Sequence, residues 1–270
     1  MIEEIDLQQD ARSCTIEITM SETSPQSLPD GLVAALKNAR HVAILTGAGI
    51  SAESGLPTFR DAMTGLWARF RPQDLATPEA FLRDPRLVWQ WYAWRRELVA
   101  QAAPNAAHLT LVQIEQHVPT FTLITQNVDG LHQRAGSQNV IELHGNIART
   151  KCFDENTIVE DWPKTDEVPP RCHRCGGLLR PDVVWFGEVL PRQAFTKAVQ
   201  AATQCDLFFS IGTSGTVEPA ASLLEVAQRS GAATAILNLD VTPFASTGHY
   251  RVNGQAGTIL QVLLNQAWPV

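Results

Sequence analysis

The chain contains a glycine-rich segment of the kind that binds phosphate groups, Gly47-Ala-Gly49-Ile-Ser-Ala52. It follows His41–Thr46, an apolar run with the length and flanking glycine of a buried parallel strand. Glycines at such a place allow a tight turn and let backbone N–H groups approach a pyrophosphate, whose charge then lies at a helix N-terminus. By itself the motif leaves two alternatives open, a dinucleotide site and a plain turn.

The residues after this loop argue against a dinucleotide-dependent dehydrogenase. Such an enzyme continues with a full helix and a second strand that ends in an acidic residue about twenty positions on. Here Gly55-Leu-Pro57 ends the helix early, and no second strand is indicated near Trp67. We therefore expect chemistry other than hydride transfer.

Polar clusters also follow three later apolar runs. They are Gln126-Asn127-Val-Asp129, Gly212-Thr-Ser214 and Asn238-Leu-Asp240. In a doubly wound sheet, ligands bind just past the carboxyl ends of the strands. One such cluster is more often a turn, but four polar strand ends together favour a shared ligand site.

Three of the five cysteines, Cys152, Cys172 and Cys175, lie in one polar, Pro-rich stretch. The odd number of cysteines and an acidic N-terminal region without a secretory pattern disfavour a disulfide framework. This clustering favours a metal site.

The elements that must position these residues alternate along the chain. Apolar runs at 41–46, 121–125, 206–211 and 234–239 predict strands, and the stretches 31–40, 78–83, 87–102, 106–116, 194–203 and 219–230 predict helices. This alternation predicts an α/β fold, a Rossmann-like doubly wound parallel sheet with a small inserted zinc-binding module. We expect a flexible N-terminal extension (1–29), a first part of the Rossmann-like domain (30–149), a small zinc-ribbon-like module without a convincing strand (150–181) and a second part of the Rossmann-like domain (182–270).

The composition narrows the class of protein. The chain has 270 residues, 44% of them apolar, and a net charge of -7. A nucleic-acid-binding surface normally carries a basic excess, and no apolar stretch reaches the eighteen residues that a membrane span needs. We expect a cytoplasmic protein that binds neither nucleic acid nor a membrane.

Three longer motifs resemble the sirtuin signatures, in the sirtuin order. They are Thr46-Gly-Ala-Gly-Ile-Ser-Ala-Glu-Ser-Gly-Leu-Pro-Thr-Phe-Arg60, Thr125-Gln-Asn-Val-Asp-Gly-Leu-His132 and Glu142-Leu-His-Gly145. The resemblance covers the chain from about Gly31 onward. It implies an enzyme that consumes NAD while removing acyl groups from protein lysines, releasing nicotinamide and O-acyl-ADP-ribose.

The resemblance also assigns roles to single residues. His144 would be the general base, a task suited to imidazole because its ordinary pKa is near neutral; the residue types alone do not separate His144 from His132. Asn127 is the second expected catalytic residue. The residues expected to contact NAD are Gly47, Ala48, Glu53, Phe59, Arg60, Gln126, Asn127, Asp129, Gly212, Ser214, Asn238, Asp240 and Ala256.

Two further segments resemble the parts of sirtuins that bind the acylated peptide. Val184-Trp-Phe-Gly-Glu188 would pair with the peptide backbone, through Val184, Phe186 and Gly187. Tyr92 and Arg95, three apart on a predicted helix, with Ala62, resemble the branch that removes succinyl and malonyl groups. A planar guanidinium can bind the distal carboxylate with two charge-assisted hydrogen bonds.

The metal motif departs from the family pattern. Sirtuins of the usual type hold zinc with two C-x-x-C pairs, and Cys172-His-Arg-Cys175 is one such pair, but the other reads Cys152-Phe-Asp-Glu155. Zinc accepts carboxylate oxygen, so Cys152, Glu155, Cys172 and Cys175 could hold a structural zinc ion. A lost site is the alternative.

Two alternatives to a deacylase stay open. The chain could be a non-catalytic module that binds NAD or ADP-ribose, or an ADP-ribosyltransferase. The presence of both His144 and Asn127 favours the deacylase.

Overall fold

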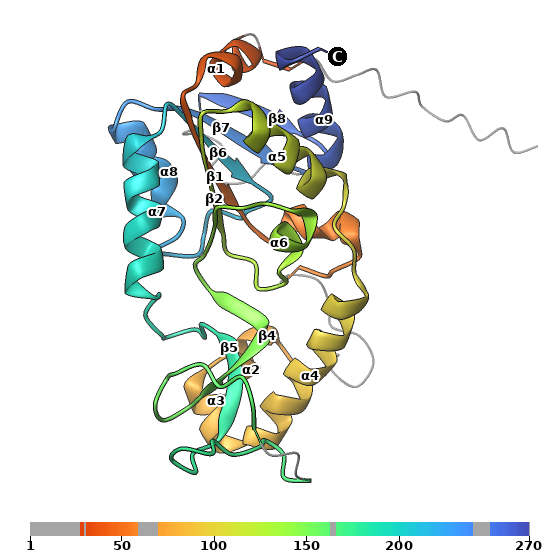
Figure 1. Cartoon of the computed structure of the whole chain (residues 1–270), viewed down its shortest axis with the longest axis vertical. Coiled ribbons are helices and arrows are strands. Elements are labelled where there is room, and N and C mark those ends of the chain that lie inside the picture. Colours follow the sequence, from red (N-terminus) through yellow and green to blue (C-terminus); the bar gives the residue numbers. More distant parts are fainter. Residues whose placement is uncertain (1–27, 30, 59–69, 163–165, 240–248, 270) are drawn as a thin grey trace, which may run out of the picture.

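The computed structural model describes residues 28–29, 31–58, 70–162, 166–239 and 249–269 (Figure 1). Its centre is a parallel sheet of six strands in the order β3-β2-β1-β6-β7-β8. The strands are β1 (His41–Thr46), β2 (Thr120–Thr125), β3 (Val140–Glu142), β6 (Leu207–Ile211), β7 (Ala233–Asn238) and β8 (Tyr250–Asn253). The predicted fold class is confirmed. The chain moves outward in one direction from β1 and in the other from β6, so the topological switch point lies between these two strands.

Helices cover both faces of this sheet, which explains the continuous apolar runs of its strands. Along β1, Val42 and Ile44 belong to the core on one side of the sheet, whereas Ala43 and Leu45 belong to the core on the other side. Successive side chains of a strand point to opposite sides. The first face is covered by α1 (Leu32–Asn38), α5 (Ala106–His117) and α9 (Ala256–Ala267), and the second by α7 (Arg192–Gln204) and α8 (Ser222–Arg229). The short helix α6 (Leu131–Ala135) follows β2.

A smaller unit lies below the sheet in Figure 1. It contains α2 (Pro72–Leu75), α3 (Pro78–Arg83), α4 (Pro85–Gln101) and an antiparallel pair, β4 (Gly145–Cys152) with β5 (Leu179–Val183). Its core is aromatic, with Phe81, Trp91, Tyr92 and Trp185 fully buried. The predicted domain boundaries at 149/150 and 181/182 stay predictions.

The pairing of β4 with β5 corrects the expectation that the stretch from Thr150 to Arg180 holds no strand. Lys151 pairs with Arg180 in this ladder, and both are buried. Charged residues at inward positions hide the alternation of apolar and polar residues that marks a strand in a sequence. Within the described ranges, no helix combines the length and hydrophobicity that crossing a bilayer requires.

Candidate functional site

Two glycine loops meet at the switch point with only backbone between them. Gly47 N donates to Ile211 O at 3.0 Å, and Gly49 N donates to Gly212 O at 2.8 Å. A Cβ on Gly47 would lie 2.8 Å from Gly212 O, and a Cβ on Gly212 would lie 2.4 Å from Ile50 N. Gly212 also has a φ of 62°, the left-handed region that glycine tolerates. The loop after β1 and the loop after β6 therefore approach as closely as backbones can, at the edge of the sheet where nucleotides bind in this fold class.

The loop after β2 is tied to the first glycine loop by a serine that the sequence patterns did not single out. Ser51 Oγ, in the 3-10 helix η1 (Ala48–Ser54), accepts from Asn127 Nδ2 at 3.1 Å and donates to Asp129 Oδ2 at 2.8 Å. Asp129 also accepts from Leu131 N at 2.9 Å. Burial raises the pKa of Asp129, although these hydrogen bonds oppose the shift. Ser51 thus holds the expected catalytic amide of Asn127 beside the carboxylate of Asp129.

His144 presents one ring nitrogen as a base. Its Nδ1 lies 2.9 Å from Gln126 O. Because a carbonyl oxygen can only accept, Nδ1 carries the proton and Nε2 keeps its lone pair. Burial lowers the pKa of His144 below its ordinary value, and the bond to Gln126 only partly offsets this shift. The imidazole is therefore neutral near pH 7, as a general base must be.

The other candidate histidine, His132, lies inside the protein. It is 1% exposed, and its Nε2 lies 2.9 Å from Thr46 Oγ1. Thr46 uses its own proton to bond Thr125 Oγ1 at 2.9 Å, so its oxygen accepts from His132. Burial, with a smaller effect from the neighbouring His108, lowers the pKa of His132 to about 3. These contacts identify His132 as a structural residue beneath the glycine loop.

Several residues expected to contact NAD meet at the ends of β2, β6 and β7, strands that lie on the two sides of β1. Asn238 Nδ2 donates to Thr213 O at 3.1 Å, and Gln126 Nε2 lies 3.4 Å from Thr213 Oγ1. Ser214 Oγ and Thr216 Oγ1 lie 2.8 Å apart in the same loop. The ends of β2, β6 and β7 are thereby joined through Thr213.

The side chain of Glu53, a residue of η1, reaches the N-terminus of α9. Its Oε1 accepts from Gly257 N at 3.0 Å, where a carboxylate satisfies a free N–H and interacts favourably with the helix dipole. This contact brings Ala256, the first residue of α9, next to the end of η1. Four of the predicted site residues, Phe59, Arg60, Ala62 and Asp240, lie outside the described residues.

The segment expected to bind a peptide runs beside the candidate base. Val184 N donates to His144 O at 2.9 Å, and Phe186 N donates to Ala76 O at 2.9 Å. Gly187 has a φ of 87°, and the Phe186 side chain is exposed. The segment therefore connects the loop that carries His144 with the helices of the smaller unit.

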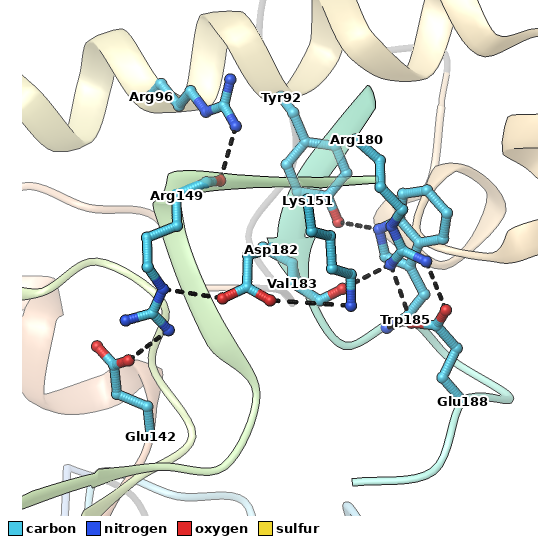
Figure 2. Close-up of polar contacts among 10 residues, drawn as sticks. All are labelled: Tyr92, Arg96, Glu142, Arg149, Lys151, Arg180, Asp182, Val183, Trp185 and Glu188. Carbon is cyan, nitrogen blue, oxygen red and sulfur yellow. Dashed lines mark hydrogen bonds and ion pairs between the residues drawn. The ribbon is translucent and has the colours of Figure 1, made fainter. Parts of the chain in front are cut away.

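Tyr92 and Arg95 lie on α4, close to this segment. Trp185 Nε1 donates to Tyr92 Oη at 2.9 Å (Figure 2), and the Arg95 guanidinium lies 5.1 Å from the centre of the Trp91 ring. Burial lowers the pKa of Arg95 below its ordinary value, yet an arginine stays charged at neutral pH. The positive charge of Arg95 acts on Asp129, where it slightly opposes the rise in pKa that burial causes. Arg95 thus places a positive charge near the candidate catalytic loop, and Tyr92 places a hydroxyl at Trp185 of the expected peptide-binding segment.

A group of potential metal ligands lies at the far end of the β4–β5 pair. The ligand atoms of Cys152, Glu155, Cys172 and Cys175 all lie within 4.8 Å of one another. A zinc ion with Zn–S bonds of about 2.3 Å needs ligand atoms about 3.8 Å apart, so the four residues fit a tetrahedral site. Backbone N–H groups of Cys175 and Arg174 lower the pKa of the Cys172 thiol to about 7. The bond from Gly177 N lowers the pKa of Cys175, but the neighbouring Cys152 thiol and burial raise it to about 11, as expected when thiols share one site.

The fold and the strand-end residues together define an α/β protein with a nucleotide-type site at the switch point of its sheet. Residues 47–219 match the model of the Sir2 family, and the chain belongs to this family. The chain is similar to the NAD-dependent protein deacylase of Aquifex aeolicus, with 51% identity over 82% of this chain and 92% of the relative. It is also 46% identical to NAD-dependent protein deacylase 1 of Pseudomonas aeruginosa, over 88% of this chain and 98% of the relative.

Solved structures agree with this assignment. A complex of a Sir2 homologue with NAD matches with a TM-score of 0.83 and 44% identity, over 89% of this chain and 94% of that chain. A complex of Sir2 with a p53 peptide and NAD+ matches with a TM-score of 0.78 and 32% identity, over 88% of this chain and 97% of that chain. The sirtuin resemblance stated from the motifs is thereby confirmed.

Proposed function

We propose that the chain is an NAD-dependent protein-lysine deacylase that releases nicotinamide and O-acyl-ADP-ribose. The observation that carries the proposal is the tautomer of His144, whose Nδ1–H is bound by Gln126 O so that Nε2 is the basic atom. In this reaction the acyl oxygen of the acyl-lysine would attack the ribose carbon of NAD and displace nicotinamide. His144 would then take a proton from a ribose hydroxyl, whose oxygen would attack the imidate carbon, and water would complete the release of free lysine and O-acyl-ADP-ribose. The relatives that share this sequence carry the name NAD-dependent protein deacylase.

The remaining strand-end residues support binding of the co-substrate. The glycines let the backbones of the two loops meet at the switch point, where a pyrophosphate would bind, and Gln126, Asn238 and Ser214 present polar groups next to them. Asn127 and Asp129, bridged by Ser51, would hold the carboxamide of nicotinamide. Because these polar groups are already held in place by hydrogen bonds, little free energy is needed to reorient them when the substrate binds.

We further propose a preference for succinyl and malonyl groups over acetyl groups. The Arg95 guanidinium would bind the distal carboxylate of the acyl group, and Tyr92 would donate a hydrogen bond to it. An apolar acetyl group offers neither residue an acceptor at that position. The acylated peptide itself would pair with the backbone of Val184, Phe186 and Gly187 as an added strand.

We propose that the four-residue ligand group holds one structural zinc ion. Cys152, Cys172 and Cys175 would supply thiolates and Glu155 a carboxylate oxygen. Arg174 forms an ion pair with Glu155 at 3.0 Å, which would orient the carboxylate. All four ligand positions are then filled by protein, as in structural rather than catalytic zinc sites.

One assay separates the proposed deacylase from its alternatives. The protein is incubated with NAD and otherwise identical peptides that carry acetyl-lysine or succinyl-lysine, and both nicotinamide and peptide mass are followed. A deacylase releases nicotinamide and lowers the peptide mass. NAD binding without nicotinamide release would identify a binding module, and a gain of ADP-ribose on the peptide would identify a transferase. The expected cytoplasmic location stays a prediction that cell fractionation would check.

A further inference from the structure

Arg180 is a charged side chain enclosed within the smaller unit, with only 2% of its surface exposed. Its guanidinium donates to both carboxylate oxygens of Glu188, at 2.5 and 2.9 Å, and to Val183 O at 2.7 Å (Figure 2). The planar guanidinium matches a carboxylate in this two-bond arrangement, and the ion pair compensates a charge that is otherwise unfavourable to bury. The pair therefore fixes Glu188 against β5.

Glu188 in turn closes the turn that carries the expected peptide-binding segment. Its Oε2 accepts from Trp185 N at 2.7 Å, and its own N–H donates to Trp185 O at 3.0 Å. Gly187, with its positive φ, lets the chain reverse between the two residues. Although burial raises the pKa of Glu188, the bonds from Arg180 and Trp185 lower it overall, so the carboxylate stays charged. One carboxylate thus holds both ends of the turn.

Trp185 connects this turn with the residue expected to recognise the acyl group. The Arg180 guanidinium lies 3.2 Å from the centre of the Trp185 ring, in a cation–π contact. The indole N–H of Trp185 donates to Tyr92 Oη at 2.9 Å (Figure 2). An indole nitrogen can only donate, so Tyr92 oxygen is the acceptor here and its own proton is left to donate. A carboxylate can only accept.

We propose that Trp185 is a positioning residue for acidic acyl groups, held in place by the Arg180–Glu188 pair. Trp185 fixes the Tyr92 hydroxyl as a hydrogen-bond donor, and Arg95 supplies the positive charge on the same helix face. The inference rests on the proposed function, because it takes Tyr92 as a contact of the acyl group. It adds that the peptide-binding turn and the acyl-recognising hydroxyl are held by one network, so that neither moves without the other.

The test replaces Trp185 with phenylalanine, which keeps an aromatic ring beside Arg180 but removes the indole N–H. The matched control is Phe81→Leu, since the Phe81 ring packs 5.3 Å from the Trp185 ring and is itself buried. Calorimetry measures the Kd of paired succinyl-lysine and acetyl-lysine peptides, and kcat/KM is measured for both with NAD. Without the indole N–H, Tyr92 is no longer held in place to donate to the acyl carboxylate. We therefore expect Trp185→Phe to weaken succinyl-peptide binding about tenfold, the usual effect of losing one hydrogen bond to a charged group, and acetyl-peptide binding less than threefold. Phe81→Leu should lower the melting temperature and leave the ratio of the two Kd values unchanged.

A second variant, Glu188→Gln, tests the ion pair. It keeps the size of the side chain but removes the charge opposite Arg180, and it should shift the ratio of the two Kd values in the same direction as Trp185→Phe. An equal loss for both peptides in either variant, or the same change of ratio in Phe81→Leu, would overturn the positioning role. Equal binding of both peptides by the unmodified protein would overturn it as well. Selective succinyl binding without any nicotinamide release would refute the deacylase, while the Kd ratio of Trp185→Phe would still decide the role of Trp185.

Discussion

Replacing His144 with alanine removes the nitrogen that the site presents as a base. Loss of a general base lowers kcat/KM by about 10²–10⁴-fold, which corresponds to roughly 3–5 kcal/mol of transition-state stabilisation. The side chain makes one hydrogen bond to the backbone, from Nδ1 to Gln126 O. Its loss removes about 1 kcal/mol from the free energy of unfolding and lowers the melting temperature by only about 2–4 °C.

The matched control is His132→Ala, the histidine buried beneath the glycine loop. This variant loses a fully buried ring and its bond to Thr46, on the order of 2–4 kcal/mol of stability, or roughly 5–15 °C in melting temperature. At 25 °C its kcat/KM should change less than about tenfold, and NAD binding, measured by calorimetry, should persist in both variants. Normal turnover by His144→Ala, or a selective loss of turnover in fully folded His132→Ala, would show that the base has been misassigned.

Three further results are expected. Arg95→Met should raise the activation free energy for a succinyl peptide, obtained from kcat/KM, by about 2–5 kcal/mol, the effect of removing one partner of a buried charge pair. An equal fall of kcat/KM for an acetyl peptide would contradict the acyl preference. Cys172→Ser should lower the melting temperature more than Cys205→Ser, because Cys205 lies away from the ligand group and structural zinc contributes to folding; elemental analysis should find close to one zinc per chain, and a stable, metal-free protein would contradict the site. Burial holds the pKa values of His108 and His132 at about 4 and about 3, below the ordinary 6.5, so that the unfolded chain binds protons first as the pH falls. The free energy of unfolding should therefore decrease from about pH 6.5 toward pH 4, by up to roughly 2.7 kcal/mol per pH unit for the two residues, and a melting temperature that stays constant between pH 7 and pH 4.5 would contradict this assignment.

The central sheet was predictable because its strands are buried on both faces. Such strands are continuous apolar runs, as at His41–Thr46, and they end at glycines or polar residues. Because the strands are parallel, these residues all lie at the same edge of the sheet. The strands β4 and β5 were not predictable in this way, because Lys151 and Arg180 occupy buried positions, and only the fold brings Asp182 and Glu188 beside them to compensate their charges. Hydrophobic pattern carries no information about such compensation.

In the candidate site, too, some residues could be predicted from the sequence and others could not. His144 and Asn127 stand in motifs long enough to be read directly, whereas Ser51 has a role that depends on contacts 76 and 78 positions away. The bond from Trp185 to Tyr92 joins residues 93 positions apart. A hydroxyl after a glycine loop is a weak signal until the partner loop is placed next to it. The sequence patterns therefore located the loops, and the structure was needed to pair their side chains.

The pairing of β1 with β6 has a consequence for how the protein is made. These two strands are neighbours at the centre of the sheet, yet Asp206 Oδ2 accepts from His41 N across a separation of 165 residues. Synthesis proceeds at about 5–20 residues per second, so β1 waits roughly 8–33 s on the ribosome before its central neighbour exists. During that interval one edge of a strongly apolar strand is unpaired, a condition that favours aggregation. Slower translation or shortage of chaperones should therefore reduce the yield of soluble protein more than it would for a fold whose central strands are close in sequence.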